Sequence, residues 1–167
     1  MPEVQDTRRG LGVVGLVLVL AGAALVLVSF RFLDWYEIRS PSADSVPEIT
    51  FSRLHRGVDD LGGAVVASAY FAWLAWVLLI GVIAVGCVAN APSPLADAMR
   101  VGGFLIGLLA AAATYYALAQ YRDAQVNAGA TRHGVLFNST WGLWIAIVGY
   151  LLAGVGAAVG PRARTAE

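Results

Sequence analysis

Few residues in this 167-residue chain have the types and spacing that catalysis or metal binding requires. His55 and Asp59 are four positions apart, so on a helix they would share one face and could both bind a metal ion. Two ligands do not make a site, and His133 would be needed as a third. Asp59 and Asp60 are adjacent acids, but acids on a charged loop are usually solvated or matched by arginines. We therefore expect no metal site and no general acid or base.

The sequence contains no other motif that carries chemistry. No Gly-x-Ser-x-Gly elbow, zinc motif or phosphate-binding loop occurs, and no histidine lies within an apolar run where it could ligate haem. The single cysteine, Cys87, cannot form an intrachain disulfide or the thiol pair of a quinone-linked oxidoreductase. We expect Cys87 to be a small, buried helix residue. The sequence thus predicts a non-enzymatic protein without a cofactor.

The composition favours a membrane protein. Hydrophobic residues make up 59% of the chain and charged residues 13%, against about 45–50% and 25% in a soluble domain. The charged residues are too few to form a polar surface around this many apolar residues. We therefore expect the bilayer to surround them. The 11 basic and 11 acidic residues cancel, which leaves no positive field for nucleic acid. We therefore expect membrane lipids as partners and no nucleic acid.

Four apolar runs are long enough to cross a bilayer. The first has 20 residues, which as a helix reach about 30 Å, the thickness of the hydrocarbon core. The third is expected to stop before the charged Arg122 and Asp123. The predicted fold is an all-α polytopic membrane protein in which four transmembrane helices form one bundle, a single domain over residues 1–167. The predicted spans are residues 11–30, 63–89, 101–120 and 135–160, with a long loop over 31–62.

Four spans place both termini on one side of the membrane. The adjacent Arg8 and Arg9 precede the first span, and positive charge at the start of a first span favours the cytoplasm. We therefore predict cytoplasmic termini, a multi-pass protein of the inner (plasma) membrane and an extracytoplasmic long loop. The stretch Thr7–Leu11 also resembles a twin-arginine export signal, but the apolar run is too long for an ordinary signal peptide and no clear cleavage site follows it.

The long loop carries its own helix signal. Ser45 and Glu48 have the spacing of a capping box at a helix N-terminus. The alternation of Ile49 and Phe51 would also suit a short strand, so the start of the helix stays open. The pattern predicts a short amphipathic helix that lies on the membrane surface and leads into the second span. Its apolar residues recur at intervals of three, four and three: Phe51, Leu54, Val58 and Leu61.

Small residues at intervals of three and four indicate where helices approach closely, because contact between membrane helices depends on small side chains. Two such stripes lie on the third and fourth spans, and we expect them to meet. The polar run Asn138-Ser139-Thr140 opens the fourth span and is expected to hydrogen-bond to another helix. The predicted helix-packing residues are Gly103, Gly107 and Ala111 in the third span and Gly142, Ala146, Gly149, Ala153 and Ala157 in the fourth.

Tryptophan and tyrosine gather at the loop end of the predicted bundle. Interfacial aromatic belts normally flank both membrane surfaces, so a one-sided distribution predicts a face for a partner or a lipid. A thick belt that faces bulk lipid is the alternative. The residues of this predicted face are Trp35, Tyr36, Tyr70, Trp73, Trp76, Tyr115, Tyr116, Trp141 and Trp144.

The segment Phe32-Leu33-Asp34-Trp35-Tyr36, placed after a first span and before a long loop, resembles small four-span membrane proteins of actinobacteria, mycobacteria included. The resemblance implies a location in the cell envelope and transfers no catalytic residue. No ionisable residue lies at the middle of a predicted span, which argues against an ion or proton translocator.

Two functions follow as hypotheses. The first is an accessory or assembly subunit of a larger cell-envelope or respiratory membrane complex, or of a homo-oligomer, because the chain combines close-packing helices with a one-sided aromatic surface. The second is a carrier or sensor of an apolar ligand, a lipid or a quinone, held in the aromatic cluster of the outer leaflet.

Overall fold

The computed structural model describes residues 11–37, 48–61, 65–127 and 139–160. Four continuous helices in these ranges are long and apolar enough to cross a membrane: Val13–Phe32, Val65–Asn90, Ala96–Asn127 and Trp141–Val159. The predicted all-α, multi-pass fold is confirmed. The elements are α1 (Val13–Phe32), β1 (Asp34–Glu37), β2 (Glu48–Thr50), α2 (Phe51–Leu61), α3 (Val65–Ala69), the π-helical turn η1 (Tyr70–Leu74), α4 (Ala75–Asn90), α5 (Ala96–Asn127) and α7 (Trp141–Val159).

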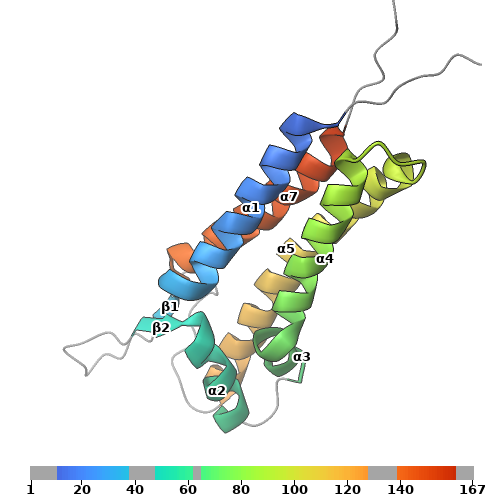
Figure 1. Ribbon diagram of the computed structural model, residues 1–167. Coiled ribbons are helices and arrows are strands. Elements are labelled where there is room, and N and C mark those ends of the chain that lie inside the picture. Colours follow the sequence, from blue (N-terminus) through green and yellow to red (C-terminus); the bar gives the residue numbers. More distant parts are fainter. Residues whose placement is uncertain (1–10, 38–47, 62–64, 128–138, 161–167) are drawn as a thin grey trace, which may run out of the picture.

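The long helices form an antiparallel bundle. α1 lies along α7, α7 also packs on α5, α5 packs on α4, and α4 touches both α1 and α7. Figure 1 shows that α1 begins and α7 ends at one end of the bundle, whereas β1, β2, α2 and α3 lie at the opposite end. We call this opposite end the hairpin end. Many large apolar side chains point outward from all four long helices, as a lipid environment requires.

Every residue predicted to pack helices is buried: Gly103, Gly107, Ala111, Gly142, Ala146, Gly149, Ala153 and Ala157. A Cβ on Gly103 would lie 2.5 Å from the Cβ of Ala157, and a Cβ on Gly107 would lie 2.8 Å from the Cα of Gly154. The backbones of α5 and α7 therefore approach too closely there for a larger residue. Gly149 instead faces α1, so α7 presents small residues on two sides.

The two strands form an antiparallel hairpin in which Asp34 pairs with Thr50 and Glu37 with Glu48. The helix that follows begins at Phe51. The capping-box interpretation is therefore wrong, because Glu48 belongs to a strand; Ser45 lies outside the described residues. Of the two alternatives for this stretch, the strand holds for Glu48–Thr50 and the helix holds from Phe51 onward.

The apolar face of α2 packs into the protein. Phe51, Leu54 and Val58 are buried in the same hydrophobic cluster as the hairpin end of the bundle, and α2 contacts α1, α3, η1 and α5. A Cβ on Gly57 would lie 3.0 Å from the hydroxyl of Tyr121. The amphipathic helix is present, but its apolar residues cover the end of the bundle rather than the membrane surface.

α5 extends beyond its predicted end at residue 120. Its 32 residues span about 48 Å, more than the hydrocarbon core. The charges of Arg122 and Asp123 end the apolar run but not the helix, because Tyr121 beside them is buried by tertiary contacts. Tyr121 is 2% exposed, and its ring meets that of Tyr36 edge to face, with 5.5 Å between centroids.

The start of α7 is joined to the hairpin. Thr140 is extended, its N–H donates to the carbonyl of Trp35 at 3.2 Å, and its hydroxyl donates to the carbonyl of Asp34. Ser139 forms a β-bridge with Tyr36. These residues therefore bond to β1 and not, as predicted, to another helix. The described helix begins at Trp141, and the earlier part of the predicted fourth span, Asn138 included, lies outside the described residues.

Candidate ligand-binding pocket

A pocket of about 460 Å³ opens at the hairpin end. It lies where the end of α1, the start of α2 and the η1–α4 junction meet, and its size falls within the range of small-molecule sites. We call it the hairpin-end pocket. Its lining residues are Phe30, Arg31, Thr50, Phe51, Ser52, His55, Phe71 and Trp76.

Four aromatic rings form the wall of this pocket. Phe30 stacks on Phe51 with 4.2 Å between centroids and an interplanar angle of 13°. Trp76 meets Phe30 edge to face at 5.3 Å, and Phe71 meets Phe51 in the same way at 5.5 Å. Trp35 supports Phe51 from behind at 5.1 Å. Such contacts are each worth about 0.5–1.5 kcal/mol beyond area burial, so the wall is held in shape without a ligand.

The π-helical turn lets two of these rings line the same pocket. Phe71 and Trp76 are five residues apart, and in a regular α-helix side chains at that spacing point about 140° apart. The i→i+5 bonding of η1 (Tyr70–Leu74) accommodates one extra residue in the turn. Residues five apart across it therefore share one side, and both rings reach the same pocket.

The end of α1 is fixed by Trp35 and Ser29. The indole N–H of Trp35 donates to the carbonyl of Ser29 at 3.1 Å, and the hydroxyl of Ser29 donates to the carbonyl of Gly142 at 2.6 Å. A Cβ on Gly142 would lie 2.5 Å from the carbonyl oxygen of Asp34. These contacts bind the hairpin and α1 to the first turn of α7 and so position Phe30.

The pocket also has a polar rim. Arg31 is exposed, and within the described residues it forms no ion pair with an Asp or Glu. The hydroxyls of Thr50 and Ser52 lie 3.3 Å apart, and the half-buried His55 completes the rim. Three rings of the wall are at most 5% exposed, so an apolar group would meet mainly the ring of Trp76. Beside this ring the pocket offers a cation and hydroxyls for a polar group.

The described residues contain no group of three His, Cys, Asp or Glu side chains that could hold a metal ion. Of the three predicted candidates, His55 lines the pocket, whereas the side chains of Asp59 and His133 lie outside the described part of the chain. Cys87 is exposed on α4 and not buried as predicted. The reason is that Gly86 faces α1, where a Cβ would lie 2.7 Å from a methyl of Val19, so the next residue points outward.

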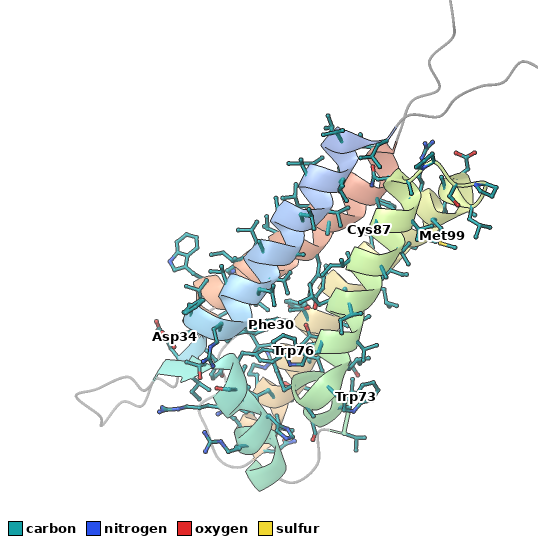
Figure 2. All side chains as sticks on the ribbon, viewed as in Figure 1. Phe30, Asp34, Trp73, Trp76, Cys87 and Met99 are labelled. Atoms are coloured by element: carbon teal, nitrogen blue, oxygen red, sulfur yellow. The ribbon has the colours of Figure 1, made fainter. Side chains whose placement is uncertain are left out.

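The predicted aromatic face is divided by the fold. Trp35, Tyr36 and Tyr70 are at most 2% exposed, so they belong to the core and cannot contact a partner. Figure 2 shows Trp76 beside Phe30 between α1 and α4, with Trp73 on the side of α4 away from α1. The exposed members are Trp73, Trp76, Tyr115, Tyr116, Trp141 and Trp144.

Most lining residues of the pocket were missed by sequence reasoning. Phe30, Phe51 and Phe71 were apolar positions within expected helices, and Arg31 was one charge among several. They come from α1, α2 and η1, and no pattern within one segment indicates that they meet. The available signal is the concentration of Trp and Tyr at the loop end of the predicted bundle.

No known protein family, curated protein or solved structure matches this chain. Its class therefore follows from its own structure: it is a multi-pass membrane protein with a helical bundle. The resemblance to actinobacterial four-span proteins stays a prediction.

Proposed function

We propose that this protein binds an amphipathic membrane ligand, a lipid or a quinone, in the hairpin-end pocket, and that it acts as a non-enzymatic carrier or sensor of that ligand. The observation that carries this proposal is the combination of an aromatic wall and a polar rim in one cavity of about 460 Å³. An amphipathic ligand matches both parts, whereas a purely apolar molecule would leave the rim unused.

The position of the pocket supports the proposal. Arg31 lies in the last turn of α1, where the helix leaves the apolar span. Trp76 is 41% exposed on a helix that faces lipid, so one wall borders the membrane. A ligand could therefore enter sideways from the leaflet, with its apolar part against the rings and its polar part at the water interface.

The test compares two tryptophans that lie three residues apart on the continuous helix Val65–Asn90. Trp76 lines the pocket, whereas Trp73 is exposed outside it. The protein is released from mild detergent into a mass spectrometer that preserves noncovalent complexes, and the bound lipid or quinone is counted. Trp76→Ala should weaken retention about tenfold, the equivalent of one lost aromatic contact. Trp73→Ala should retain the ligand as the unmodified protein does. Equal retention in both variants contradicts the proposal.

A second proposal is an accessory subunit of a larger membrane complex. It is favoured by Trp141 and Trp144, which start α7 and are 76% and 41% exposed. Exposed tryptophans at this spacing suit a helix of another protein. Joint replacement of Trp141 and Trp144 by Ala should then release a co-purifying protein while ligand retention stays unchanged. A monomer that purifies without any other protein after gentle solubilisation would contradict this second proposal.

A further inference from the structure

We infer that the ligand of the hairpin-end pocket is an anionic glycerophospholipid whose phosphate binds Arg31. This inference rests on the proposed function and narrows it, because it selects a charged lipid over a neutral quinone. It concerns the chemistry of the rim rather than that of the aromatic wall.

Among the described residues, no carboxylate pairs with the positive charge of the rim. None of the eight lining residues is acidic, and Arg31 pairs with no carboxylate of the described residues. Thr50 and Ser52 add hydroxyl donors, and His55 adds an imidazole. An anion in this position would therefore meet donors and a cation and no repelling carboxylate within the lining.

The backbone adds to this preference. Phe51 and Ser52 are the first two residues of α2 and also line the pocket. The first N–H groups of a helix have no partner within the helix, and its N-terminus carries partial positive charge. The start of this 11-residue helix thus adds partial positive charge to the pocket, which favours an anion as Arg31 does.

A phosphate matches these groups better than a quinone does. The planar guanidinium of arginine donates two parallel hydrogen bonds to phosphate oxygens. A neutral quinone carbonyl accepts hydrogen bonds but leaves the positive charge without a counter-charge as the ligand displaces water. The sequence neighbour Phe30 lies in the aromatic wall, so a head group at Arg31 would place the glycerol and upper acyl chains against the rings.

The experiment uses two lipids that differ only in the head group. Phosphatidylglycerol and diacylglycerol with identical acyl chains are added in turn to the full-length protein in a neutral detergent, and occupancy is measured by native mass spectrometry. The unmodified protein should bind phosphatidylglycerol about tenfold more tightly than diacylglycerol, the scale of one charge-assisted hydrogen bond. Arg31→Gln should abolish the difference, and Arg31→Lys should keep part of it.

The matched control is Arg56→Gln, since Arg56 is an exposed arginine of α2 outside the pocket, and it should keep the preference in full. Equal affinity of the unmodified protein for the two lipids overturns the inference and leaves the proposed function intact with a neutral ligand. A preference that survives in Arg31→Gln also overturns it.

Glycerol phosphate that binds as tightly as the lipid would assign the site to a soluble phosphate and so overturn the inference of a lipid. If Arg31→Gln does not fold, the inference is tested by the lipid preference of the unmodified protein and by its partial decrease in Arg31→Lys. Binding of neither lipid, nor of a quinone, contradicts the proposed function itself.

Discussion

Gly22 of α1 and Gly149 of α7 face each other where the two helices are in contact. A Cβ on Gly149 would lie 2.7 Å from the carbonyl oxygen of Gly22, and a Cβ on Gly22 would overlap the carbonyl oxygen of Gly149. Seven residues away along each helix, Gly15 and Gly156 repeat the arrangement, because a Cβ on Gly156 would lie 2.7 Å from the carbonyl oxygen of Gly15. The two backbones are therefore in direct contact over two helical turns.

The close approach of α1 and α7 predicts that Gly149→Leu strongly destabilises the bundle. The new side chain would meet backbone that cannot move aside, and overpacking of this kind costs about 1–3 kcal/mol. Gly102→Leu is the control, since a Cβ on Gly102 meets nothing within 4 Å. Thermal unfolding in detergent, monitored by size-exclusion chromatography, should show a lower midpoint temperature for Gly149→Leu but not for Gly102→Leu. Equal midpoints would mean that the two helices separate without cost.

The side chain of Asn90 joins α4 to α7. It is fully buried, and its amide donates to the carbonyls of Gly86 at 2.9 Å and Gly156 at 3.2 Å. Hydrogen bonds between membrane helices are worth about 0.6–1.7 kcal/mol, so Asn90→Ala should lower the free energy of unfolding by about that amount. Asn127→Ala, at the exposed end of α5, should change it little. No difference between the two variants would show that the Asn90 amide is as stable in lipid as in the bundle.

Tyr150 links α7 to the residue that follows the π-helical turn. Its hydroxyl donates to the carbonyl of Ala75 at 2.9 Å. Tyr150→Phe should therefore destabilise the protein by about 0.6–1.7 kcal/mol, whereas Tyr115→Phe, at a 41% exposed position, should be neutral. Unfolding by a denaturing detergent measures both. A neutral Tyr150→Phe would mean that the hydroxyl is not needed to fix the junction of η1 and α4.

Trp35 and Trp141 should respond in opposite ways to truncation. Trp35 is fully buried and donates to the carbonyl of Ser29, whereas Trp141 is 76% exposed. Trp35→Ala should cost about 3–5 kcal/mol, as for a large core residue, and Trp141→Ala should stay within about 0.5 kcal/mol. The same unfolding assay tests this pair. A larger loss of unfolding free energy in Trp141→Ala than in Trp35→Ala would contradict the burial of Trp35 and the exposure of Trp141.

The bundle could be predicted from sequence because each of its signals is local. Apolar runs of the right length indicate spans, and stripes such as Gly142–Gly149 indicate close packing from their spacing alone. The end of α5 could not be found in this way. Tyr121 continues the helix because Tyr36, from the hairpin, covers its ring, and this contact joins residues far apart in the chain.

The pocket could not be predicted, for a related reason. Its wall needs the extra residue of the π-helical turn, but nothing in Tyr70–Leu74 distinguishes that segment from an ordinary α-helix, since it contains neither Gly nor Pro. Its rim needs the hairpin that sets Thr50 beside the end of α1. Of the predicted aromatic face, only Trp76 lines the pocket. Trp35, Tyr36 and Tyr70 lie in the core behind it instead of on a surface.

Photocrosslinking tests the proposed ligand site most directly. A phosphatidylglycerol with a photoreactive diazirine near the top of one acyl chain is bound to the full-length protein, irradiated, and its adducts are mapped by peptide mass spectrometry. The proposal predicts adducts on the pocket wall, in the peptides that carry Phe30, Phe51 and Phe71. Their yield should fall in Trp76→Ala but not in Trp73→Ala. Adducts confined to the outward-facing residues of the long helices, unchanged in Trp76→Ala, would contradict it.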